Sequence, residues 1–117
     1  QCCETEADIC NWLIGTIERW KSEELHYQAM EQAVASEPKV AQRWMESITE
    51  AAALVTRQLC PTSSAECLKD NHLAVLALMI QFERVMFFTV VGGLLDAKSF
   101  CSVLAAQWWA VLSRIRG

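Results

Sequence analysis

The chain has 117 residues, of which 53% are hydrophobic and 21% are charged, and its formal net charge at pH 7 is −4. One domain with one core is the expectation at this length, and the acidic balance excludes the basic face that nucleic-acid binding requires. With 4 glycines and 2 prolines the chain is poor in turn formers. We therefore expect residues 1–117 to form a single all-α domain of a few long helices.

The first helix is expected to begin after Thr5, which can cap it in a box with Asp8. Apolar side chains then recur at helical spacing on Cys10, Leu13, Ile17 and Trp20. The segment 21–24 leaves two possibilities open. Ser22 could cap a new helix there, or one helix could continue to about Ser36.

The next helix is predicted over residues 37–59. Proline is tolerated in a first turn, so Pro38 indicates its start. Cys60 and Pro61 are expected to end it. Its apolar positions repeat every three to four residues, at Val40, Trp44, Ile48, Ala52, Val55 and Leu59.

A strongly apolar stretch over residues 73–95 dominates the second half of the chain. After a helical turn at 66–69 and a cap at Asp70-Asn71, we expect a helix over about 72–91 that ends at Gly92-Gly93. A helix that apolar must be buried in a core or in a membrane. The predicted fold is a disulfide-stapled bundle of four to five antiparallel helices, with this helix at its centre and amphipathic neighbours wrapped around it.

The last helix is expected over residues 97–115, with Asp96 as its cap. Together with the apolar helix it forms a hydrophobic helical hairpin over residues 72–115. Trp108 and Trp109 are consecutive, so one helix cannot bury both indoles in the same groove. Trp109 is therefore a candidate for a membrane or partner contact, with packing against a neighbouring helix as the alternative.

Three polar residues, Gln81, Glu83 and Arg84, interrupt the apolar helix. Adjacent helical residues point about 100° apart, so we do not expect Glu83 and Arg84 to pair with each other. The face that holds Gln81 and Arg84 is expected to reach solvent or to meet acids of the first half, such as Glu46 or Glu50. Alternatively, Arg84 belongs to a polar stripe that contacts a membrane or partner.

Six cysteines in so short a chain indicate three disulfides and an oxidising, extracellular environment. The alternative is a reduced protein with buried thiols. Adjacent Cys2 and Cys3 do not readily pair. If the first helical segment breaks near 21–24, helix direction places Cys101 at one end with Cys2, Cys3 and Cys10, and Cys60 with Cys67 at the other. We therefore predict a Cys60–Cys67 bridge, with Cys101 bonded to one of Cys2, Cys3 and Cys10.

Catalytic, metal and cofactor sites are not predicted. His26 and His72 have no recognisable nucleophile motif around them, and neither has the spacing to a cysteine that a zinc site requires. Both are interpreted as solvated surface histidines. Gly92-Gly93 lacks the pattern of a phosphate loop.

The start Gln1-Cys2-Cys3 fits a mature secreted product whose signal peptide has been removed. With that start, its six cysteines, its acidic charge and its apolar helix, the chain resembles the small secreted killer toxins that viruses of smut fungi encode. The resemblance is one of size and character across the whole chain. It implies a protein released to kill competing strains by acting at the membrane or wall, and it carries over no functional residues.

The leading functional hypothesis is a secreted antifungal toxin or effector that acts on a target-cell membrane or surface receptor, possibly through hairpin 72–115. A carrier that holds a hydrophobic ligand between its helices is the first alternative. A cytokine-like or other host-interaction protein is the next. An enzyme is not expected.

Overall fold

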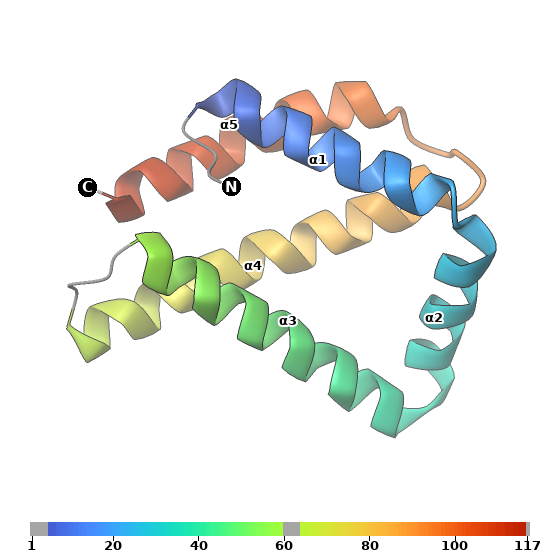
Figure 1. The fold of residues 1–117 in the computed structure, drawn as a ribbon, viewed down its shortest axis with the longest axis horizontal. Helices are drawn as coiled ribbons and strands as arrows, with labels where there is room; N and C mark the ends of the chain where they lie inside the picture. Colours follow the sequence, from blue (N-terminus) through green and yellow to red (C-terminus); the bar gives the residue numbers. More distant parts are fainter. Residues whose placement is uncertain (1–4, 60–63, 117) are drawn as a thin grey trace.

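The computed structural model describes residues 5–59 and 64–116, which form five helices (Figure 1). The predicted all-α class is confirmed. The helices are α1 (Glu6–Lys21), α2 (Glu24–Ser36), α3 (Pro38–Leu59), α4 (Ala65–Val90) and α5 (Ala97–Arg116).

Side-chain caps begin α1 and α5 where the sequence predicted them. The Thr5 hydroxyl accepts a hydrogen bond from the Asp8 N–H at 3.1 Å, and the Asp8 carboxylate accepts one from the Thr5 N–H at 3.1 Å. Asp96 accepts a hydrogen bond from the Ser99 N–H at 3.0 Å. Such caps satisfy backbone donors that the first turn of a helix leaves free, and each contributes about 1 kcal/mol.

The chain breaks between α1 and α2, as one of the two sequence possibilities had it. Ser22 is not the cap of α2, however, because its hydroxyl donates backwards to the carbonyl of Arg19 at 2.6 Å. Glu23 holds the cap position of α2 and makes no side-chain cap bond. α2 therefore starts without the local support that α1 and α5 have.

The apolar helix is longer than predicted. α4 begins at Ala65, where Ser64 accepts a hydrogen bond from the Cys67 N–H at 3.2 Å, so the predicted turn at 66–69 is its first turn and the predicted cap at Asp70-Asn71 is wrong. No proline or glycine lies between Ala65 and Val90 to stop it. Gly92 and Gly93 end it as predicted, with φ values of 72° and 59° that side chains with a Cβ rarely adopt.

The five helices do not alternate in direction. α1 and α5 lie side by side and antiparallel, with the start of α5 beside the end of α1 (Figure 1). α3 and α4 form a V, and α2 crosses between the open ends of the V instead of returning along α1. The His72 ring and the carbonyl of Thr49, 3.1 Å apart, link the two arms of the V.

The core lies where α1, α4 and α5 meet. Ile9, Leu13 and Ile17 of α1 are at most 1% exposed. Removing each such side chain from water stabilises the fold by about 1.5–3 kcal/mol. Their buried neighbours include Phe82, Met86 and Val90 of α4 and Cys101, Leu104 and Trp108 of α5.

The molecule is flat, with extents of 41 × 34 × 19 Å. A helix with its side chains is about 10 Å across, so the shortest dimension holds two layers. α4 is central, but neighbours do not wrap it on all sides as expected: 33% of its most apolar 18-residue window is buried. Leu73, Ile80 and Phe88 remain between 38% and 55% exposed.

Candidate functional site

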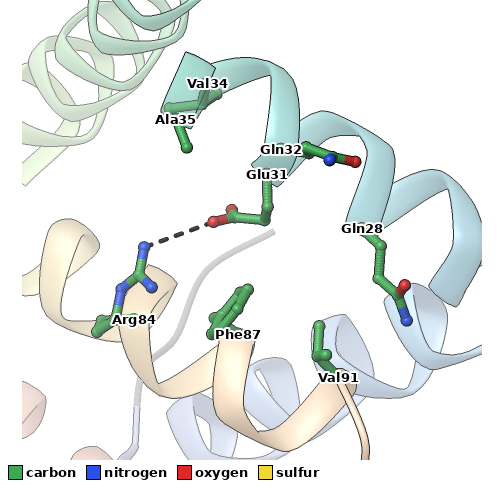
Figure 2. Close-up of a pocket in the computed structure, with 8 residues that line it drawn as sticks. All are labelled: Gln28, Glu31, Gln32, Val34, Ala35, Arg84, Phe87 and Val91. Carbon is green, nitrogen blue, oxygen red and sulfur yellow. Dashed lines mark hydrogen bonds and ion pairs between the residues drawn. The ribbon is translucent and has the colours of Figure 1, made fainter.

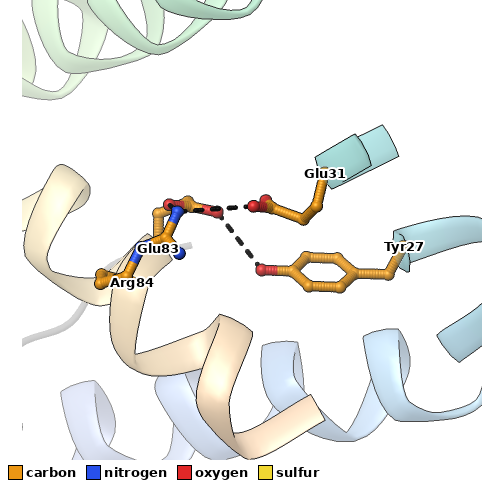
Figure 3. Close-up of polar contacts among 4 residues, drawn as sticks. All are labelled: Tyr27, Glu31, Glu83 and Arg84. Atoms are coloured by element: carbon orange, nitrogen blue, oxygen red, sulfur yellow. Dashed lines mark hydrogen bonds and ion pairs between the residues drawn. The ribbon is translucent and has the colours of Figure 1, made fainter. Parts of the chain in front are cut away.

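A cluster of four polar side chains joins α2 to the middle of α4 (Figure 3). Tyr27 and Glu31 lie one turn apart on α2, and Glu83 and Arg84 are consecutive on α4. The buried Tyr27 hydroxyl donates to Glu83 Oε2 at 3.3 Å. Arg84 Nη2 lies 3.4 Å from Glu31 Oε1 and 3.3 Å from Glu83 Oε1.

This geometry corrects one prediction and refines another. Glu83 and Arg84 do pair, because the long arginine side chain bends back over the 100° that separates the two residues. The acid of the first half that meets Arg84 is Glu31, not Glu46 or Glu50. Gln81 on the same face donates to Gln107 of α5 at 3.0 Å.

Two carboxylates and one guanidinium leave this cluster with an excess of negative charge. Burial raises the pKa of Glu31 to about 7, and hydrogen bonding to Glu83 and its charge raise it further than Arg84 lowers it. A hydrogen bond between two carboxyl groups requires a proton on one of them, so Glu31 holds a proton below neutral pH. Burial, followed by the charges of Glu83 and Glu31, raises the pKa of the Tyr27 phenol well above its ordinary value.

The cluster forms one wall of an open groove of about 510 Å³ between α2 and α4 (Figure 2). The Arg84 guanidinium lies 4.8 Å from the centre of the Phe87 ring, close enough for a cation–π contact. The lining residues are Gln28, Glu31, Gln32, Val34 and Ala35 of α2 with Arg84, Phe87 and Val91 of this end of α4.

A second groove, of about 630 Å³, runs between α2 and α3. Val34 lines both grooves. Its other lining residues are Met30 and Ala33 of α2 and Lys39, Val40, Arg43, Trp44 and Ser47 of α3.

Apolar side chains also gather around the α4–α5 turn. Leu94 is 71% exposed in the turn itself, and Phe88 precedes it at 39%. On the first turns of α5, Phe100 is 40% and Val103 57% exposed. The start of α2 meets this turn, because Glu24 accepts a hydrogen bond from the Gly92 N–H at 3.3 Å.

The predicted contact residues have different surroundings. Arg84 keeps 56% of its side chain exposed. Trp108 is 9% exposed and packs against Trp12 and Phe82, so it is not a surface contact in this fold. Trp109 is half-buried against the core, which is the alternative predicted for it. Trp12, expected in the core, is 45% exposed.

The cysteine predictions are only partly open to inspection. Cys2, Cys3 and Cys60 lie outside the described residues, so the Cys60–Cys67 bridge stays a prediction. Cys10, Cys67 and Cys101, the cysteines that the structure describes, are free thiols. Because α5 starts beside the end of α1, Cys101 is not grouped at the beginning of α1 as helix alternation implied. Cys10 is near enough for its charge to raise the pKa of Cys101, after burial, to about 11.

The histidines differ from each other. His26 is exposed and stacks on Trp20, with ring centres 6.2 Å apart. His72, expected at the solvated surface, is half-buried against α3. Within residues 5–59 and 64–116, no group of three His, Cys, Asp or Glu side chains could hold a metal ion.

Sequence reasoning identified Arg84 but missed Tyr27 and Glu31 as its neighbours. The available signal was Glu83, a lone acid on an otherwise buried face of α4, which requires a polar partner from another helix. No protein-family model matches the chain, and the comparisons with curated proteins and with solved structures found no match.

Proposed function

We propose that the chain is a secreted toxin or effector that acts on target-cell membranes through α4 and the α4–α5 turn. The observation that carries this proposal is the exposure of α4. Its 26 residues are long and apolar enough to cross a bilayer, with a mean hydropathy of 1.8 in the most apolar window, yet 33% of that window is buried. A helix with this composition gains more from lipid than its present neighbours provide.

The α4–α5 turn is the part of the molecule that would enter lipid first. Leu94, Phe88 and Phe100 project from it, and each apolar side chain that leaves water stabilises the bound state by about 1.5–3 kcal/mol at full burial. Lys21 and Lys98 lie close enough to lower the pKa of Asp96, after its hydrogen bonds to Ser99. These two cations favour a surface of anionic lipids.

Deeper entry of α4 meets the polar residues in its middle. A charged side chain at the bilayer centre costs about 2.5–3.5 kcal/mol on insertion scales. The Glu83–Arg84 pair, at 3.3 Å, offers a way to reduce that cost because it neutralises both charges within one helix. The same entry requires α2 to leave α4, since Tyr27 and Glu31 are bonded to this pair.

Dye release from liposomes with anionic lipids tests the proposal. We expect the full chain to release dye, and Leu94→Asp to reduce release at least tenfold because the charge lies in the turn that enters lipid. Leu54→Asp is the matched control: Leu54 is 57% exposed on α3, whose end is joined to the start of α4, and its release should equal that of the wild type.

Growth inhibition of related and unrelated fungi by the purified chain tests the biological role. Selective inhibition that Leu94→Asp abolishes is the expected result. A wild-type chain that neither releases dye nor slows the growth of any target cell would contradict the proposal.

A further inference from the structure

The apolar face of α3 is covered along only part of its length. This helix carries apolar side chains along one stripe, but Ala52 and Thr56 are the members of the described chain that α3 buries fully. Both lie in the half that packs on α4. The first half faces α2 alone, and there Val40 and Trp44 remain half-buried.

These partly covered side chains form the floor of the α2–α3 groove. Met30, Ala33 and Val34 of α2 face Val40 and Trp44 of α3 across it. Its volume of about 630 Å³ lies within the range of small-molecule sites, which are mostly apolar with a few polar groups. From Lys39 to Ser47, the groove follows α3 for about 12 Å, at 1.5 Å of rise per residue.

Two cations lie along the same wall. Lys39 and Arg43 are one turn apart on α3, and both line the groove. Neither makes an ion pair or hydrogen bond with any residue in 5–59 or 64–116. The amino-terminal end of α3 adds positive partial charge beside Lys39. Among nearby acids, Glu31 of α2 is bonded to Arg84 instead, and Glu37 lies just before α3.

We propose that the α2–α3 groove binds a single-chain amphiphile with an acidic head group, of the fatty-acid class. The carboxylate lies between Lys39 and Arg43, and the tail lies along Val40, Val34 and Trp44. Charge complementarity selects an anionic head over a neutral or cationic one. The groove is separate from the α4–α5 turn, so this binding does not depend on entry into a membrane.

Calorimetric titration of the full chain with decanoate, below its micelle concentration, tests the proposal. We expect saturable binding with one decanoate per chain and weaker binding of decanol. The Lys39→Gln/Arg43→Gln double variant should lose about tenfold in affinity. The control is Arg57→Gln/Lys69→Gln, which removes the same charge from exposed residues that line neither groove and should bind as the wild type does.

The position of the tail is tested through Trp44. Its indole N–H signal, assigned by comparison with Trp44→Phe, should shift on titration with decanoate, and Trp44→Ala should weaken binding with the cations intact. Circular dichroism and Tm of each variant establish that it is folded.

Three results would overturn the proposal. The first is equal weakening by both double variants, which indicates a general charge effect. The second is binding of decanol as tightly as decanoate. The third is a response to anionic vesicles or micelles only, without binding of monomeric decanoate.

Discussion

The phenol of Tyr27 on α2 donates a hydrogen bond to the carboxylate of Glu83 in the middle of α4, across 56 positions of the sequence and 3.3 Å of space. Both side chains are buried, at 2% and 8% exposure. A buried carboxylate without partners costs several kcal/mol, so this bond allows an otherwise apolar stretch of α4 to keep an acid. It also fixes α2, which buries no other side chain fully, to the rest of the fold.

Stability should fall as the pH rises from about 4.5 to about 7, because Glu31 binds its proton more tightly in the folded chain than in the unfolded one. Its pKa is raised from 4.5 to about 7, so the folded state takes up more protons in this interval. The contribution is complete below pH 4.5 and lost as the pH passes 7. Because water screens the partly exposed groove, we expect about 1–2 kcal/mol. Urea unfolding at a series of pH values measures it.

The Glu31→Gln variant should remove most of this dependence. The amide keeps a donor for Glu83 at every pH and carries no charge, so the variant should be more stable than the wild type at pH 8 and similar to it at pH 4. Glu50→Gln, on an exposed position of α3, is the control and should leave the pH profile unchanged. Identical profiles for wild type and Glu31→Gln would show that Glu31 titrates in the same way in both states.

Replacement of Tyr27 by Phe should lower the free energy of unfolding by about 1–3 kcal/mol, because buried Glu83 loses a donor. The ring itself should stay packed against Trp20 and Phe87, whose centres lie 5.3 and 6.5 Å from its own. A double-mutant cycle of Tyr27→Phe with Glu83→Gln isolates the bond. A coupling energy near zero would mean that the hydrogen bond does not support the α2–α4 contact.

Local signals in the sequence predicted the helices well. Thr5, Asp96 and Gly92-Gly93 act through bonds or backbone angles within their own segment, and the structure has them in the predicted places. The start of α4 was misplaced because two caps competed, Ser64 and Asp70-Asn71. A continuous helix allows the residues after Ser64 to make main-chain hydrogen bonds that a second start would have lost.

Relations between helices could not be predicted in the same way. Helical periodicity shows that a face is apolar but not which helix covers it, so α2 was expected to run back along α1 when it instead crosses the V of α3 and α4. The pairing of Glu31 with Arg84 depends on that crossing. For the same reason, the sequence placed Trp12 in the core and left Trp109 open, although Trp108 fills the space between Trp12 and Phe82.

The two glycines Gly15 and Gly92 should respond to alanine in opposite directions. Gly15 lies inside α1, and an added Cβ meets no atom within 4 Å, so Gly15→Ala should stabilise the fold by about 0.5–1 kcal/mol through helix propensity. Gly92 has a φ of +72°, so Gly92→Ala should destabilise it by about 1 kcal/mol or more. Thermal unfolding of both variants measures the two effects. Stabilisation by Gly92→Ala would contradict the left-handed turn after α4.

A peptide map under non-reducing conditions tests the predicted disulfides. We expect a Cys60–Cys67 fragment, which closes a short local loop, and a second fragment that joins Cys101 to Cys10. Recovery of Cys60 bonded to Cys2 or Cys3 would contradict the local bridge. Alkylation of all six cysteines without prior reduction would instead support the alternative of a reduced protein.

In the reduced, folded chain, Cys67 should react with iodoacetamide at least tenfold faster than Cys101. Alkylation requires a thiolate that the reagent can reach. Cys67 is exposed, whereas Cys101 is 0% exposed between α1 and α5. Burial and the charge of Cys10 raise the pKa of Cys101 to about 11, so little of it is ionised at pH 8. Mass spectrometry of timed samples follows each site, and the two cysteines should react at similar rates in denaturant. Equal rates in the folded chain would contradict the packing of α5 on α1.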